Sequence, residues 1–115
     1  MKKICIILFL VAAINAVNAQ TYNGPESIEY DAAGDRYFIA NSNNGQILAR
    51  SNSGALTVFA SGMTGGPYGL EIVGSTIYAC DGGTIKGFDL SSGSQVANVN
   101  LSATFLNGKI GRAHV

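Results

Sequence analysis

The sequence is poor in the residues that most often carry catalysis or bind metals. Its 115 residues contain no tryptophan, one histidine (His114), two cysteines (Cys5 and Cys80) and two prolines. So few Cys and His side chains exclude a structural zinc site, which takes four such ligands. Cys5 lies in an apolar stretch at the N-terminus, so Cys80 has no disulfide partner in the rest of the chain. We interpret Cys80 as a small buried hydrophobic residue.

Charged residues are also scarce, and the two signs balance at seven Lys and Arg against seven Asp and Glu. The balance comes from the ends of the chain. Residues 20–108 contain three basic and seven acidic residues, which gives a net charge of −4. This mildly acidic segment has no Lys/Arg cluster. It therefore lacks the basic patches by which proteins bind nucleic acids or anionic membrane surfaces.

The N-terminus has the organisation of an export signal. Two lysines precede an apolar run over residues 4–17, and Val17-Asn18-Ala19 places small residues before Gln20. The run is shorter than the roughly 20 residues that a membrane-spanning helix needs. We predict a signal peptide over residues 1–19, a periplasmic, extracellular or cell-surface location, and no membrane span after cleavage.

The last residues differ from the rest of the chain. Ile110–Val115 is the peptide that a widely used short-read sequencing adapter encodes in one frame before a stop codon. We interpret residues 109–115 as adapter read-through and give His114 no role in the fold or in a site. The alternative is a genuine short C-terminus.

One segment of the chain occurs twice. Asn23–Asp31 reads Asn-Gly-Pro-Glu-Ser-Ile-Glu-Tyr-Asp, and Gly65–Val73 reads Gly-Gly-Pro-Tyr-Gly-Leu-Glu-Ile-Val. Each copy leads into short apolar runs separated by Gly, Asn and Ser turns, and nothing after the signal has helical periodicity. A repeat of roughly 40 residues that is built from short strands is typical of β-propeller blades.

The expected strands follow from these runs. In the first of them, Ile28 and Tyr30 share one face and Glu29 lies on the other, polar face. The run over 36–40 is typical of a strand covered on both faces, and the pair Asn44-Gly45 favours a tight hairpin. We expect strands over 27–31, 36–40, 46–50 and 55–59, and in the second copy over 70–72, 77–81 and 83–85.

The resulting fold class is all-β: a β-propeller fragment with about two four-stranded antiparallel blades of an expected six. Residues 20–108 then contain the first two blades and the start of a third at residues 104–108. The alternative is a β-sandwich, which short strands at this spacing also suit.

Four segments of the chain, at residues 24–31, 36–47, 66–72 and 78–90, have a familiar pattern. Through them residues 22–108 resemble the opening blades of the gluconolactonase-like, senescence-marker-protein-like and luciferin-regenerating-enzyme-like six-bladed propellers. The same motifs are also similar to those of NHL-type propellers. The resemblance implies that blades C-terminal to these two, on the same polypeptide, are their partners.

The resemblance also implies a chemistry. Enzymes of this superfamily are metal-dependent lactonases, in which an early Glu, a mid-chain Asn and a later Asp hold a divalent cation, usually calcium, in the central channel. The early Glu belongs to a Glu-Gly-Pro motif, and this chain has Asn23 in that place. The other two ligands would lie beyond Gly108.

Three residues are candidates for binding a divalent cation such as calcium. Asn23 is one by the resemblance, and Glu29 and Glu71 are the others because they share one position of the repeat. Carboxylates facing a channel would suit a hard cation. The alternative is that both are paired or solvated structural residues. Asn41 and Asp81, at the ends of strands, are expected to cap turns.

The sequence thus predicts an exported β-propeller domain that acts as a ligand-binding or scaffold module. No residue is assigned a catalytic role, and the ligand, a small molecule or a protein, stays unspecified. One alternative is a metal-dependent lactone or ester hydrolase of the gluconolactonase type, in which the cation polarises the carbonyl and activates water. The other is a structural pair of blades in a larger surface protein.

Overall fold

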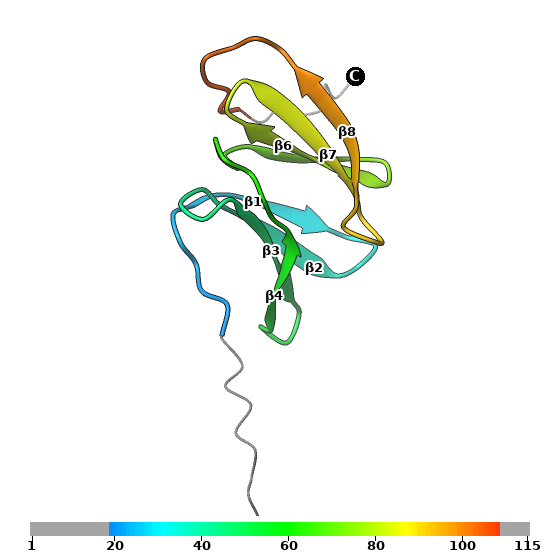
Figure 1. Cartoon of the computed structure of the whole chain (residues 1–115). Coiled ribbons are helices and arrows are strands. Elements are labelled where there is room, and N and C mark those ends of the chain that lie inside the picture. The colour runs from blue at the N-terminus through cyan, green and yellow to red at the C-terminus, as the bar shows by residue number, and fades with distance from the viewer. Residues whose placement is uncertain (1–18, 109–115) are drawn as a thin grey trace, which may run out of the picture.

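The structure, a computed structural model, describes residues 19–108 (Figure 1). The predicted signal peptide, apart from Ala19, and the adapter-like segment therefore lie outside the described residues. No helix within residues 19–108 is long and apolar enough to cross a membrane. The described strands are β1 (Pro25–Asp31), β2 (Arg36–Asn41), β3 (Gln46–Ser51), β4 (Leu56–Ala60), β5 (Leu70–Val73), β6 (Thr76–Asp81), β7 (Thr84–Asp89) and β8 (Gln95–Asn100).

These strands form two four-stranded antiparallel sheets, in which each strand pairs with the next one along the chain. The first sheet has the order β1-β2-β3-β4 and the second has the order β5-β6-β7-β8. The all-β class and the two four-stranded units are thereby confirmed. Residues 101–108, where the sequence suggests the start of a third copy, contain no strand.

The two sheets share one pairing register. Ile28 lies opposite Ile39 across β1 and β2, and Leu70 lies opposite Ala79 across β5 and β6. Each position of the first sheet therefore has an equivalent in the second. Ile28 and Leu70 are further apart in the sequence than Ile39 and Ala79, because the turn that joins the first two strands is shorter in the second sheet.

Each sheet has two faces, since side chains alternate along a strand. The side of the second sheet that packs on the first sheet is called its front face, and the opposite side its back face. In the first sheet, the front and back faces are those that carry the equivalent positions of the repeat. The front faces are Leu70, Ile72, Ile77, Ala79, Lys86 and Phe88 in the second sheet and Ile28, Tyr30, Tyr37, Ile39, Leu48 and Arg50 in the first; the back faces are Glu71, Tyr78, Cys80, Ile85 and Gly87 in the second sheet and Glu29, Phe38, Ala40, Ile47 and Ala49 in the first.

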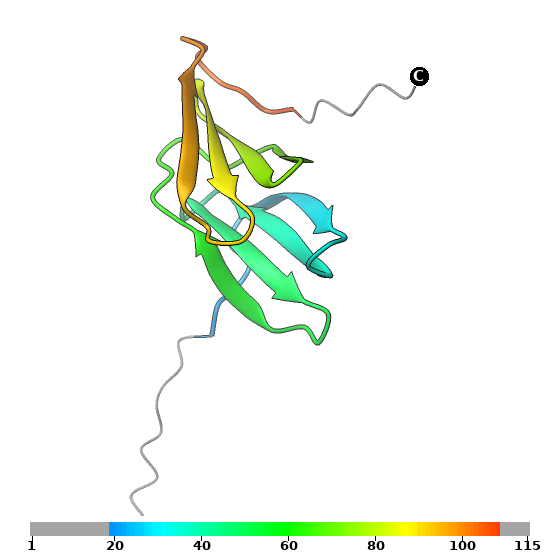
Figure 2. The ribbon, with the colours of Figure 1, turned by 90° about the vertical axis from the view of Figure 1, so that its right-hand side faces the viewer.

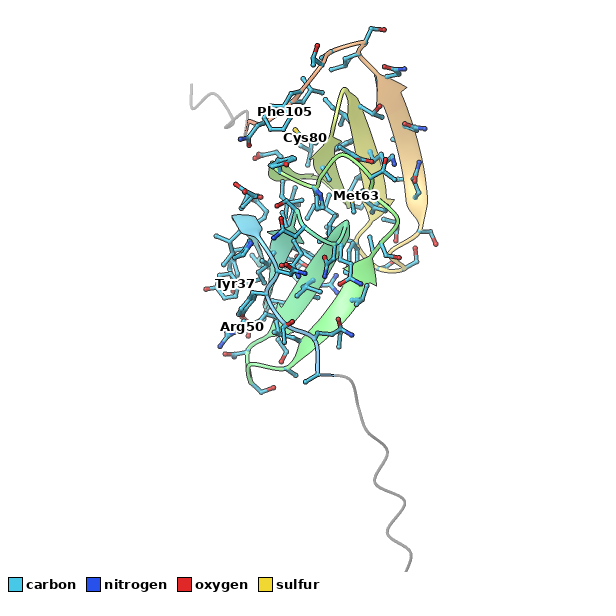
Figure 3. The ribbon with its side chains drawn as sticks, turned by 60° about the vertical axis from the view of Figure 1, so that its left-hand side comes forward. Tyr37, Arg50, Met63, Cys80 and Phe105 are labelled. Atoms are coloured by element: carbon cyan, nitrogen blue, oxygen red, sulfur yellow. The ribbon has the colours of Figure 1, made fainter. Side chains whose placement is uncertain are left out.

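The hydrophobic core lies between the back face of the first sheet and the front face of the second (Figures 1 and 2). Phe38 and Ile47 from the first sheet and Leu70 and Ile77 from the second are each at most 1% exposed. Met63, from the connection between the sheets, also belongs to this core (Figure 3). Neither sheet could bury these side chains alone, so the two sheets stabilise each other.

Two glycines repeat a close backbone approach. A Cβ on Gly45 would overlap the carbonyl group of Met63, and a Cβ on Gly83 would overlap that of Ala103. Only glycine permits such contact without moving the neighbouring backbone. The chain that leaves the second sheet therefore follows the same path as the chain that leaves the first.

One expectation about burial is confirmed in part and one is wrong. Phe38, Ile39 and Ala40 are buried, so β2 is covered on both faces over these residues, but Tyr37 is 38% exposed. Cys80 is only half-buried, although the equivalent Ala40 is fully buried. Tyr37 lies on the front face of the first sheet and Cys80 on the back face of the second. Within residues 19–108 no third sheet covers either of these faces.

Candidate functional site

The candidate site follows the first strands of the two sheets, β1 and β5, which lie beside each other. Glu29 on β1 reaches across to β5, where its Oε1 accepts a hydrogen bond from the N–H of Ile72 at 3.3 Å. Ser27 donates its hydroxyl to the carbonyl oxygen of Tyr68 at 2.6 Å. Both side chains lie on the back face of the first sheet. Polar contacts between side chain and backbone thus join the two first strands.

Glu71 has the same place in the second sheet but does not join Glu29. It lies opposite Tyr78 on the back face of the second sheet, and its Oε2 is buried. Glu29 lies between the two sheets. The two candidate carboxylates are therefore on opposite sides of the second sheet.

Asn23 lies in the segment before β1, and its polar groups contact two other asparagines. Its backbone N–H donates to Oδ1 of Asn41 at 3.1 Å, and its side-chain oxygen accepts from Nδ2 of Asn43 at 3.1 Å. Asn41 is fully buried and also donates to the carbonyl oxygen of Thr21 at 3.0 Å. Asn41 therefore ties the segment before β1 to the end of β2.

Asp81 makes the corresponding bond in the second sheet. Its Oδ1 accepts from the N–H of Gly65 at 2.6 Å, and its Oδ2 forms an ion pair with Nζ of Lys86 at 2.6 Å. We expected Asn41 and Asp81 to bond to the turns that follow their strands, and this expectation is wrong. Each bonds instead to the segment that precedes the first strand of its own sheet. The sequence signal for this was a joint repeat, in which Asn23 recurs as Gly65 and Asn41 recurs as Asp81.

The described residues do not assemble a cation site. The side chains of Asn23, Glu29 and Glu71 contact different parts of the fold, as described above. No group of three or more His, Cys, Asp and Glu side chains that would hold a metal ion occurs within residues 19–108. Calcium takes six to eight oxygen ligands, so a site along the first strands would need ligands from outside this range.

Two strand residues that bond to turns have shifted pKa values. A hydrogen bond from the hydroxyl of Tyr30, on β1, to Asp35, together with the negative charge of Asp35, raises the pKa of Tyr30. Hydrogen bonds from the hydroxyl and backbone of Ser91 and Ser92 lower the pKa of Asp89, the last residue of β7. Each bond ties the strand residue to the turn that follows its strand.

A groove of about 630 Å³ opens on the front face of the first sheet. The rings of Tyr30 and Tyr37 pack beside it at 4.9 Å between centroids, and Figure 3 shows Tyr37 and Arg50 on this side of the sheet. Sequence reasoning missed the groove, because alternation does not say which face another sheet covers. Its lining is Tyr22, Pro25, Glu26, Ser27, Ile28, Tyr37, Ile39 and Arg50.

No protein-family model, no curated protein and no solved structure matches this chain. The case for a function therefore rests on three properties of the molecule. These are the repeat, the way the two sheets pack, and the contacts of the polar side chains.

Proposed function

We propose that this chain is part of an exported β-propeller domain that acts as a ligand-binding or scaffold module. In this proposal residues 1–19 direct export, the two sheets are the first two blades, and further blades of the same polypeptide complete the ring. The assembled ring then binds a small molecule or a protein.

The observation that carries the proposal is the way the two sheets pack, with the back face of the first sheet on the front face of the second. In a two-sheet sandwich the two apolar faces pack against each other and the outer faces are solvated. Here the apolar front face of the first sheet points away from the second sheet, with Ile28 60% and Tyr37 38% exposed. In a radial stack each sheet packs its back face on the front face of the next, which supplies a cover for this face.

The strand order supports the same arrangement. β1 and β5 are the first strands of their sheets and lie beside each other, whereas β4 and β8 end the sheets on the other side (Figure 2). Blades of a propeller surround a central channel in this way, with equivalent strands at equivalent distances from its axis. The first strands would then line the channel.

The contacts of the polar side chains support a binding or scaffold role. Glu29, Asn41 and Asp81 each bond to backbone groups that fix one strand or segment against another. Asp31 pairs with Arg36 at 2.9 Å, which also serves the packing of the sheets. These groups are engaged in architecture, so the chemistry offered at the surface is that of contact and recognition.

The decisive experiment is a long read of the parent gene through the codon for Gly108. We expect the reading frame to continue with about four more blades. A genomic stop codon directly after Val115 would refute a ring formed by one polypeptide.

The complete protein is then assayed for hydrolysis of a panel of aldonolactones, with and without a chelator. No hydrolysis supports the binding module, and chelator-sensitive hydrolysis replaces it with the lactonase alternative. In the second case Asn23→Ala tests the proposed ligand. Asn43→Ala is the matched control, since it removes the hydrogen bond to Asn23 but leaves the amide oxygen of Asn23 in place.

A further inference from the structure

The interface between the two sheets joins two different surfaces, a back face and a front face. A further sheet could therefore make the same contact at either end of the stack. The back face of the first sheet contributes Phe38 and Ile47, and the front face of the second contributes Leu70 and Ile77. A contact between two different surfaces leaves one copy of each surface open at the ends of the stack. In this chain the open surfaces are the front face of the first sheet and the back face of the second.

The open front face exposes apolar side chains whose equivalents are covered in the second sheet. Ile39 and Leu48 on the same face are already buried, and Arg50 has the place of Phe88. Ile28 is 60% exposed where the equivalent Leu70 is 1% exposed, and Tyr37 is 38% exposed where Ile77 is fully buried. Val58 adds a further apolar side chain at 39% exposure. The groove described above lies on this face and would receive side chains from a sheet packed on it.

The back face of the second sheet is apolar as well, and one of its residues, Cys80, already contacts the carbonyl oxygen of Gly108. Tyr78 takes the place of the fully buried Phe38, and Ile85 takes that of Ile47; both are half-buried. Val99, which lies opposite Ile85 on β8, is 50% exposed. This face therefore offers aromatic and aliphatic side chains like those that hold the first sheet on the second.

The residues that form the polar link between the sheets also recur in the sequence. Glu29 accepts the N–H of Ile72, and Glu71 is the equivalent of Glu29. The equivalent of Ile72 is Tyr30, on β1. A sheet packed on the back face of the second sheet through its own β1 would bring the N–H of Tyr30 to the position that Ile72 has relative to Glu29.

We propose that copies of this 115-residue chain associate head to tail, the back face of the second sheet of one copy packing on the front face of the first sheet of the next. The occupant of both open faces is then a second copy, because one chain carries both halves of an interface that it already forms internally. The inference rests on the proposed function in treating the sheets as blades. It concerns the 115-residue chain by itself, since further blades of a longer polypeptide would cover these two faces in place of a second copy. If the ring has six blades, it closes with three copies.

The test measures the molar mass of the whole chain, recovered after export, by light scattering and sedimentation over about a hundredfold range of concentration. We expect a mass that rises with concentration to three copies. A chain that has β-type circular dichroism and stays monomeric throughout would overturn the proposal.

Three Lys substitutions at positions of similar exposure locate the contact. Ile28→Lys lies on the front face (60% exposed), Val99→Lys on the back face (50%), and Val96→Lys, at 59%, belongs to neither defined face. Because a lysine in an apolar interface is costly, the first two should each weaken association about tenfold or more. Val96→Lys should associate like the parent chain. Equal association of all three variants would overturn the proposal.

Mixing the variants tests the polarity of the contact. Ile28→Lys retains an intact back face, and Val99→Lys retains an intact front face. Their equimolar mixture should form a one-to-one dimer, although each alone stays monomeric. A parent chain that associates while this mixture does not would refute the head-to-tail arrangement.

The two proposals fail separately, since one concerns the parent gene and the other concerns this chain. A gene that stops after Val115 refutes a ring of one polypeptide and leaves self-association intact. A complete six-bladed protein whose 115-residue part is monomeric refutes self-association alone.

Discussion

The two sheets differ most at positions that the repeat makes equivalent. Leu70 is 1% exposed and its equivalent Ile28 is 60% exposed, although both are aliphatic residues on the first strand of their sheet. On the other face the difference is reversed, since Phe38 is fully buried and Tyr78 is half-buried. Burial at these positions therefore depends on the place of a sheet in the stack. It does not differ at every position, since Ile39, on the same face as Ile28, is 4% exposed and its equivalent Ala79 is 1% exposed.

This comparison predicts that equivalent substitutions have unequal effects, with the largest difference in the shared core. Phe38→Ala should lower the free energy of unfolding by about 3–5 kcal/mol, because it leaves a cavity between the two sheets. Tyr78→Ala should cost less than about 2 kcal/mol, because solvent already reaches the ring. Urea unfolding at a concentration where the chain is monomeric measures both.

The control for this pair is a second pair on the front faces. Leu70→Ala removes a buried side chain, whereas Ile28→Ala removes one that is mostly in water. If Ile28→Ala or Tyr78→Ala destabilised the monomer as much as its buried equivalent, the two open faces would be covered in solution. The difference in exposure between equivalent positions of the two sheets would then not exist in solution.

A smaller difference in the free energy of unfolding is expected at Asn41 and Asp81, which use an amide and a carboxylate for equivalent bonds in the two sheets. Asp81→Asn keeps an acceptor for the N–H of Gly65 and should cost about 1 kcal/mol through the lost pair with Lys86. Asn41→Asp should cost more, about 3 kcal/mol, because Leu48 has the place of Lys86 in the first sheet and the new buried charge gains no cation there. Thermal unfolding of both variants tests this order.

The double variant Asn41→Asp with Leu48→Lys serves as the control. It supplies the missing cation from the equivalent position, so it should be more stable than Asn41→Asp with Leu48→Met. If the two double variants were equally stable, the cost at residue 41 would come from the lost donor to Thr21 and not from the charge.

The outer part of the interface provides the next comparison. Arg36 pairs with Asp31, donates to the carbonyl oxygen of Leu90 in the second sheet, and lies 4.6 Å from the ring centre of Phe38. Its equivalent in the second sheet is Thr76, so this link occurs once in the described residues. Arg36→Met should lower the free energy of unfolding by about 1–2 kcal/mol, and Thr76→Ala should lower it by less than about 0.5 kcal/mol.

Arg36→Lys separates charge from geometry, because an ammonium group keeps the pair with Asp31 but cannot also serve the carbonyl of Leu90 as the planar guanidinium does. We expect the free energy of unfolding of Arg36→Lys to lie between those of the parent chain and Arg36→Met. Hydrogen exchange of the β7–β8 turn, which contains Leu90, should be faster in both variants. Unchanged exchange would show that Arg36 does not hold the second sheet.

The sequence predicted seven of the eight described strands, because period-two alternation and turn residues act locally. It gave no range for β8, and β7 extends beyond the expected residues 83–85 to Asp89. Asn44-Gly45 and the apolar run after Arg36 each specify a turn or a strand without reference to the rest of the chain. The repeat then placed equivalent residues correctly, which is why Glu29 and Glu71 share one register position. Local signals and self-similarity together therefore gave the two sheets.

What the sequence did not provide was the direction of each face. Alternation distinguishes Ile28 from Glu29 but does not say that Glu29 faces another sheet while Ile28 faces solvent. The partners of Asn41 and Asp81 were missed for a related reason, since they lie in segments well before these residues in the chain. Such contacts depend on tertiary packing, which propensity and spacing do not encode.

The smallest expected difference lies in the last hairpin of each sheet, where a carboxylate in one is replaced by a hydroxyl in the other. Asp89 accepts hydrogen bonds from Ser91 and Ser92 in the β7–β8 turn, and the equivalent Ser51 binds Ser53 and the N–H of Ala55 in the β3–β4 turn. These bonds favour ionised Asp89, so its pKa in the folded chain lies below the unfolded value. Their stabilisation is present above the unfolded pKa and is lost as the pH falls through the folded pKa.

Acid should therefore loosen the β7–β8 turn before the β3–β4 turn. The protection factors of the Ser91 and Ser92 amides, which correct for the slower intrinsic exchange in acid, should fall as Asp89 becomes protonated. The protection factor of Ala55 should change little, because Ser51 does not titrate in that range. Asp89→Asn removes the titration and should make both turns equally insensitive to acid, while Ser91→Ala should raise the pKa of Asp89 towards its ordinary value. Equal acid sensitivity of the two turns in the parent chain would mean that the sheets loosen together, and that Asp89 does not distinguish them.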